Sequence, residues 1–271
     1  MNYGFVFPYG DPRWLSEAAR IAEDHGWDGV FIPDCIHITV ANGPTFDPWV
    51  ALAAMAMRTE RVRLGPMRTP LSRRRPWKVA RETMSLDHLS NGRLILSVGL
   101  GALDDAGFGA VGEATDRRTR AEMLDESLAI ITGLWTGHPF SFSGQHFQVG
   151  EMTFLPPIVQ RPRIPIWVAG IWSSQRSLAR ALRWDGLLPN RVESDADWRG
   201  LDPILAARRQ EGPFDYVVEG RTPGDDRAAA AATVTPFVLR GATWWLEAMW
   251  LAPNGPDDIL RRVRQGPPRF V

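Results

Sequence analysis

Short apolar runs alternate with longer amphipathic segments from the beginning of the chain. The runs at 3–8, 27–33, 61–67 and 92–101 have the length and the Val, Ile, Leu and Phe content of buried β-strands. Helical spacing of apolar residues follows each run, and two of these segments open with Asp-Pro, at Asp11-Pro12 and Asp47-Pro48. Aspartate caps helices well and proline fits the first helical turn. The first half of the chain therefore predicts four strand–helix pairs.

The alternation is interrupted once and then resumes. The stretch "PFSFSGQHFQV" alternates apolar and polar residues around Ser143-Gly144, which predicts a β-hairpin. Four further strands follow the proline-rich 155–165, each with a helical segment after it, at 165–170, 186–190, 214–220 and 242–249. Eight such pairs predict an α/β fold, a (β/α)8 TIM barrel with a hairpin insertion before strand five, as one domain over 1–271. A doubly wound fold would need a glycine-rich fingerprint after the first strand, and "PYGDPRW" is not one.

Composition narrows the classes of partner. Lys+Arg and Asp+Glu both number 31 among 271 residues, and no basic stretch alternates with aromatics, so nucleic acid is not expected as a partner. The densest positive run, "SRRRPWK", is typical of a solvated helix start. A single cysteine excludes an internal disulfide framework, and no apolar run reaches the ~18 residues of a membrane span. The N-terminus lacks a signal-peptide pattern, so we expect a soluble, cytoplasmic protein that acts on a small molecule.

In a barrel of this kind, reactive groups gather at the carboxyl ends of the strands. Four predicted strands end in an ionisable residue at that position, and aromatic side chains are expected around the same mouth. The ionisable residues are Asp34, Arg68, Glu219 and Glu247. The aromatic residues are Phe7, Trp172, Trp245 and Trp250. In "VAGIWSSQRS" a strand ends at Gly170 and a serine caps the next helix, which leaves backbone N–H groups from Ile171 to Ser174 for a phosphate.

Cys35 and His37 follow the second strand and allow three interpretations. Residues two apart in an extended segment can chelate a metal, but no further Cys/His motif supplies ligands, so no metal site is predicted. Cys35 is a nucleophile only if the turn brings His37 back as its base. A lone cysteine at the end of an apolar strand is more often simply buried.

Three stretches carry a family resemblance: "RVRLGPMRTPLSRRRPWKVARETMSLDHLSNGRLILSVGLG", "RAEMLDESLAIITGLWTG" and "RPRIPIWVAG". They resemble luciferase-like monooxygenases, a family that includes bacterial luciferase and deazaflavin-dependent dehydrogenases. The resemblance implies a barrel with an inserted hairpin and a non-proline cis peptide at Met67–Arg68 against the flavin ring. It also implies further cofactor contacts, which are Gly99, Leu100 and Gly101 beside the ring and Gly170, Ile171, Trp172, Ser173 and Ser174 around a phosphate.

The chain departs from the family pattern at three positions. Deazaflavin-dependent sugar dehydrogenases carry Asp-His after strand two, where this chain has Asp34-Cys35, and an acid where it has Ala102. The arginine that helps hold the flavin phosphate in bacterial luciferase corresponds to Leu100. We therefore do not expect dehydrogenation of sugars.

We interpret the chain as an oxidoreductase that uses reduced FMN, a monooxygenase of a small organic substrate. The alternative cofactor is a deazaflavin of the F420 type, with hydride transfer; a non-catalytic flavin-binding relative and a cofactor-free hydrolase or aldolase remain open. A separate flavin reductase and a homodimeric state are expected from the resemblance. The predicted catalytic residues are Asp34, Arg68 and Glu247, and the predicted substrate pocket contains Phe7, Cys35, Ala102 and Trp245.

Overall fold

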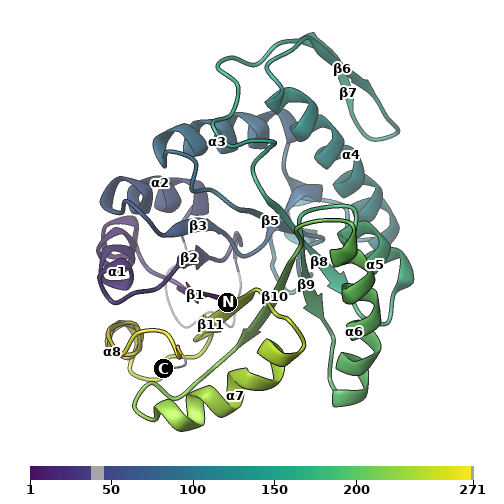
Figure 1. Cartoon of the computed structure of the whole chain (residues 1–271). Helices are drawn as coiled ribbons and strands as arrows, with labels where there is room; N and C mark the ends of the chain where they lie inside the picture. Colours follow the sequence, from purple (N-terminus) through teal and green to yellow (C-terminus); the bar gives the residue numbers. More distant parts are fainter. Residues whose placement is uncertain (38–45, 270–271) are drawn as a thin grey trace.

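A ring of parallel strands forms the centre of the computed structural model, which describes residues 1–37 and 46–269 (Figure 1). The sheet runs from β3 through β2, β1, β11, β10, β9 and β8 to β5 and β4. The bounds are β1 Asn2–Val6, β2 Gly29–Ile32, β3 Arg63–Pro66, β4 Thr69–Pro70, β5 Leu96–Gly99, β8 Ile166–Ile171, β9 Gly186–Asn190, β10 Asp215–Gly220 and β11 Trp244–Ala248.

The ring closes between β3 and β5. Leu64 N–H donates to Arg93 O at 3.1 Å, and Ile95 N–H donates to Leu64 O at 2.9 Å. Gly65 permits this approach, because a Cβ there would lie 2.2 Å from the carbonyl oxygen of Ile95. The predicted third strand, 61–67, contains β3, and the short β4 follows it after a cis peptide at Met67–Arg68, so two segments fill the third strand position of the ring. The predicted TIM barrel is confirmed, with its third strand divided in two.

Eight α-helices in the described part of the chain surround the ring. They are α1 Pro12–Asp24, α2 Pro48–Arg58, α3 Pro76–Leu89, α4 Arg117–Trp135, α5 Gln175–Ala181, α6 Asp195–Gln210, α7 Arg227–Leu239 and α8 Pro256–Arg264, with 3-10 turns at Leu71–Arg73 and Gly109–Val111. Both Asp-Pro starts are confirmed: Asp11 accepts N–H bonds from Arg13 and Trp14, and Asp47 does the same for Trp49 and Val50. No described helix has the length and apolarity needed to cross a membrane.

The predicted hairpin is present as β6 Phe140–Ser143 and β7 Gln148–Met152, an antiparallel pair that projects beyond α4 (Figure 1). Its turn is held by Glu126 of α4, whose carboxylate accepts N–H bonds from Gln145, His146 and Phe147. The hairpin is therefore fixed to the outer helix layer.

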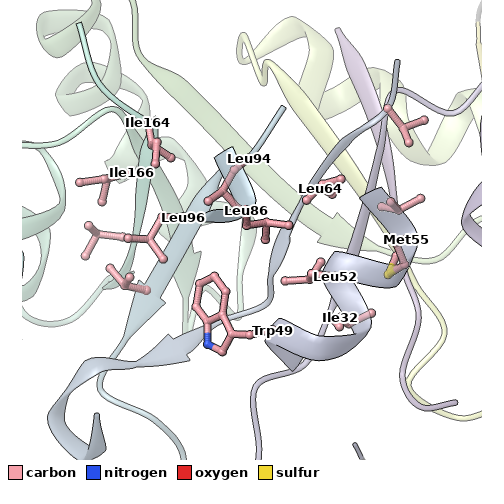
Figure 2. Close-up of a cluster of buried hydrophobic side chains, with 14 of the residues drawn as sticks. Ile32, Trp49, Leu52, Met55, Leu64, Leu86, Leu94, Leu96, Ile164 and Ile166 are labelled. Atoms are coloured by element: carbon pink, nitrogen blue, oxygen red, sulfur yellow. The ribbon is translucent and has the colours of Figure 1, made fainter. Parts of the chain in front are cut away.

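Two apolar layers follow from the alternation of side chains along each strand. One fills the interior of the ring and includes Phe31, Trp167, Trp244 and Leu246. The other lies between the ring and the helices, and Figure 2 shows the part of it packed under α2 and beside β5. Parallel strands buried on both faces leave only their ends free for polar chemistry.

Candidate active site

A cavity of about 570 Å³ opens at the carboxyl ends of the strands. Its wall includes the cis peptide between Met67 and Arg68, the end of β5 at Gly99, and Ile171 at the end of β8. A second, more open hollow of about 640 Å³ lies at the opposite, amino-terminal face, around Trp27 and Arg63. Barrel enzymes place their chemistry at the carboxyl face, so we assign the candidate site to the 570 Å³ cavity.

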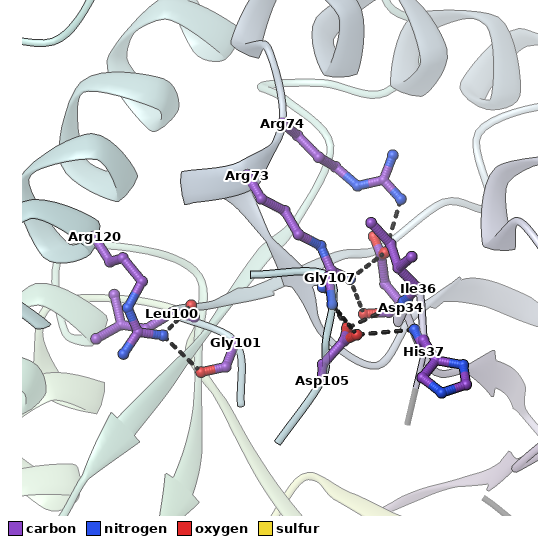
Figure 3. A network of polar contacts seen from close by, with 10 residues as sticks. All are labelled: Asp34, Ile36, His37, Arg73, Arg74, Leu100, Gly101, Asp105, Gly107 and Arg120. Carbon is purple, nitrogen blue, oxygen red and sulfur yellow. Dashed lines mark hydrogen bonds and ion pairs between the residues drawn. The ribbon is translucent and has the colours of Figure 1, made fainter. Parts of the chain in front are cut away.

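A buried ionic network forms one wall of this cavity (Figure 3). The Arg73 side chain is only 2% exposed; it pairs with Asp105, and its Nη2 lies 3.4 Å from Oδ1 of Asp34. Arg74 donates to the same Asp34 oxygen at 2.7 Å. The network ties the loop after β2 to the loop after β5, so it sets the shape of the cavity wall.

Asp105 is the centre of that network. It accepts N–H bonds from Ile36, His37 and Gly107 at 2.9–3.1 Å in addition to its bond from Arg73. Burial opposes ionisation of Asp105, but the bonds from Arg73 and the backbone outweigh it and lower the pKa of the carboxyl group. Asp105 is therefore a charged brace between two loops.

The cavity carries an excess of positive charge, with five arginines against two aspartates along its wall. Arg120 is 5% exposed and donates to the carbonyl oxygens of Leu100 and Gly101 at 3.0 Å. Burial lowers the pKa of its guanidinium below the ordinary value for arginine. Within the described part of the chain, neither Arg120, Arg117 nor Arg191 pairs with a carboxylate. These three cations are available to an anion.

Asp34 and Cys35, at the end of β2, both line the cavity as predicted. The Asp34 side chain is fully buried, and its Oδ2 has no hydrogen-bond partner among the described residues. Burial raises the pKa of the Cys35 thiol to about 11, and the charges of Asp105 and Asp34 add to the effect. The thiol is thus neutral at physiological pH, which argues against Cys35 as a nucleophile. No metal-holding group of three His, Cys, Asp or Glu occurs within 1–37 and 46–269.

Three of the predicted catalytic and substrate-pocket residues lie outside the cavity, because their side chains point outward from the ring. Phe7 and Trp245 belong to the layer between ring and helices and are at most 2% exposed. Glu247 is two residues after Trp245 on the same face, and its carboxylate accepts 2.7 Å bonds from the N–H and the hydroxyl of Thr222. An ion pair with Arg262 at 3.3 Å completes its surroundings. Glu247 thus has internal partners that anchor the C-terminal helix.

The expected row of free N–H groups from Ile171 to Ser174 is contradicted at three of its four positions. Ile171 N–H donates to Ser177 Oγ, Trp172 N–H to Asn190 O, and Ser174 N–H to Ile171 O, each at 3.0 Å. Ser174 caps α5, as predicted for one of the two serines. Of the predicted phosphate contacts, Ile171 lines the cavity, whereas Gly170, Trp172, Ser173 and Ser174 do not. Gly170 is required instead by packing, since a Cβ would lie 2.4 Å from Leu187.

The predicted contacts at the other strand ends come together. Met67 and Arg68 line the cavity, as do Gly99, Leu100, Gly101 and Ala102. Sequence reasoning missed most of the charged wall, namely Arg73, Asp105, Arg117, Arg120 and Arg191. Arg73 belongs to the run that we interpreted as a solvated helix start, and the structure corrects this for Arg73 and for Arg74, which is 19% exposed.

Comparisons with known proteins agree with this geometry. The family model described as luciferase-like monooxygenase matches residues 6–265. The chain is 31% identical to an uncharacterized protein of Mycobacterium tuberculosis over 252 residues, which covers 84% of this chain and 87% of that one. It is 28% identical to an F420-dependent glucose-6-phosphate dehydrogenase of Nakamurella multipartita, over 93% of this chain and 83% of that one.

Solved structures share the fold. The monooxygenase RslO1 from Streptomyces bottropensis superposes with a TM-score of 0.82 at 20% identity, covering 98% of this chain and 97% of that one. An F420-dependent secondary alcohol dehydrogenase gives a TM-score of 0.78 at 17% identity, covering 95% and 96%. At these identities the likeness concerns the barrel alone.

Proposed function

The chain belongs to the luciferase-like monooxygenase family and is an oxidoreductase, and from this premise we propose that it uses a deazaflavin coenzyme of the F420 type for hydride transfer. The curated relatives with a stated activity support this choice of coenzyme over the FMN that we expected first. The coenzyme would lie in the 570 Å³ cavity, with its ring against the Met67–Arg68 peptide.

The charge of the cavity is the observation that carries the proposal. Arg117, Arg120 and Arg191 line it without carboxylate partners in the described chain. FMN brings one phosphate group, whereas an F420-type coenzyme brings a phosphodiester and several carboxylates on its tail. Arginine binds phosphate and carboxylate oxygens with two parallel hydrogen bonds, so several unpaired arginines favour the coenzyme with more anionic groups.

The cavity wall near the Met67–Arg68 peptide also suits the ring of the coenzyme. The buried Oδ2 of Asp34 has no hydrogen-bond partner within 1–37 and 46–269 and can accept an N–H bond from a heterocyclic ring. Arg73 and Arg74 hold the other Asp34 oxygen and so fix the orientation of this acceptor. When bound, the coenzyme would supply a hydride, which carries both electrons of the reaction, and the protein would orient its ring.

The substrate is not expected to be the glucose 6-phosphate of the curated relatives. Cys35 and Ala102 line the cavity at the positions that carry a histidine and an acid in the sugar dehydrogenases that the chain resembles. A thiol whose pKa is near 11 and a methyl group cannot exchange protons with a substrate at neutral pH. Another small organic substrate is therefore required.

Anaerobic turnover tests the proposal. The protein is mixed with reduced F420 and a panel of ketones and enones, or with oxidised F420 and the corresponding alcohols, and the absorbance of the oxidised coenzyme is followed. We expect substrate-dependent turnover with F420. Oxygen consumption and substrate oxygenation with reduced FMN, without any reaction of F420, would instead support the FMN monooxygenase.

A further inference from the structure

The Arg68 guanidinium finds no hydrogen-bond acceptor in the part of the chain that the structure describes. Its stem lies over the end of β5, where a Cβ on Gly99 would be 3.9 Å from Arg68 Cβ. The side chain lines the cavity, is 28% exposed, and makes no hydrogen bond among the described residues. The nearest carboxylate oxygen, Oε2 of Glu219, is 4.0 Å from its Nη1. A largely covered guanidinium in a cavity calls for an acceptor from a ligand.

Glu219 and Trp250 lie beside Arg68, and Trp250 is the one of the two that lines the cavity. Glu219 lies near the end of β10, and its Oε1 accepts a hydrogen bond from Nε1 of Trp250, which follows β11. The bond orients the indole, which lines the cavity and is 41% exposed as a residue. Residues near three strand ends thus lie side by side: the flat indole of Trp250, the carboxylate of Glu219, and the guanidinium of Arg68, which makes no hydrogen bond to the described residues.

We propose that Arg68, Glu219 and Trp250 form the substrate subsite and select an uncharged carbonyl compound with a planar apolar body. Arg68 donates to the carbonyl oxygen, and Trp250 covers the body of the substrate. The Glu219 carboxylate repels a substrate that is itself a carboxylate, because the two negative charges would share one guanidinium. The reaction at this subsite rests on the proposed function, whereas the groups that bind the substrate belong to the protein itself.

The chemistry of the subsite follows from its charges. When a carbonyl carbon gains a hydride, its π electrons move to the oxygen, and a proton from water at the mouth completes the alcohol. The substrate would be reduced by two electrons, both carried by the hydride that a reduced deazaflavin supplies. Arg68 faces the oxygen on which negative charge develops, so its N–H groups stabilise the transition state more than the ground state.

Binding of two matched probes tests the subsite without turnover. Acetophenone and benzoate have the same ring and differ in charge. Isothermal titration calorimetry measures each in phosphate buffer, whose anions occupy Arg117, Arg120 and Arg191, with and without oxidised F420. We expect acetophenone to bind at least about tenfold more tightly than benzoate. Arg68→Gln should lower the affinity for acetophenone by roughly tenfold, because it removes a charge-assisted hydrogen bond. Arg13→Gln, an exposed arginine of α1, is the control.

The Glu219→Gln variant separates selection from folding, because Glu219 is a partly exposed residue. Glu219→Gln should bind benzoate more tightly than the unmodified protein does, so the ratio of the acetophenone and benzoate affinities should decrease. The melting temperature should stay unchanged. Equal binding of both probes to the unmodified protein, or unchanged acetophenone binding in Arg68→Gln, overturns the subsite. Failure of F420 to bind while the preference persists contradicts the proposed function and leaves the subsite supported.

Discussion

The ion pair between Asp105 and Arg73 allows a quantitative test of how much the buried network stabilises the protein. Asp105→Asn keeps the shape of the side chain and removes the charge that faces Arg73. Breaking a buried ion pair costs about 3–5 kcal/mol, and since Arg73 retains its contacts with Asp34, the lower end applies. With an unfolding entropy near 2.1 cal/mol/K per residue, 271 residues give roughly 2 °C per kcal/mol. We therefore expect a melting temperature about 6 °C lower at pH 7.

Thermal unfolding followed by circular dichroism measures the effect, with Asp104→Asn as the matched control. Asp104 is the exposed neighbour and makes no ion pair or side-chain hydrogen bond within the described residues. Because the pKa of Asp105 is lowered in the folded protein, its contribution is present above the unfolded pKa near 3.9 and is lost as the pH falls through the folded value.

The difference between the unmodified protein and Asp105→Asn should therefore narrow below about pH 4. If Asp105→Asn melts within 1 °C or so of Asp104→Asn at pH 7, the network does not stabilise the fold to the extent reasoned from its burial.

Three further predictions concern the thiol, the ring closure and the charge of the cavity. Cys35 should resist iodoacetamide at pH 8, as its pKa near 11 implies, and Cys35→Ser should keep most of the activity; rapid alkylation that abolishes activity would restore the nucleophile hypothesis. Gly65→Ala should destabilise the barrel by about 1–3 kcal/mol or more in urea unfolding, since its Cβ would meet the carbonyl of Ile95, whereas Gly150→Ala in open space should be neutral. F420 affinity should fall steeply between 50 and 500 mM NaCl, and an unchanged dissociation constant would show that the arginines do not bind its anionic groups.

The order of strands and helices was predictable, because each strand is a short apolar run and each early helix begins with Asp-Pro. The direction in which strand residues point was not. Strands of a barrel are buried on both faces, so Phe7, Trp245 and Glu247 look no different in sequence from residues that face the mouth. Only the pairing of the strands decides between the two faces.

The charged wall was missed for a different reason. Arg73 lies in a run of three arginines, which resembles a surface, and its burial depends on Asp105, 32 positions later in the chain. No local pattern connects two loops that follow different strands. Roles at the cavity that came from the family resemblance, such as those of Gly99 and Leu100, stay predictions, as does the homodimer.

Coenzyme binding is the most direct test of the central claim that this barrel works with a deazaflavin. Equilibrium dialysis of the purified protein against oxidised F420 and FMN, separately and in competition, gives both dissociation constants under one condition. We predict saturable binding of one F420 per chain, at least about tenfold tighter than FMN, and weaker binding of F420 by Arg120→Gln. FMN binding that equals or exceeds that of F420, or no binding of F420 at all, would contradict the account.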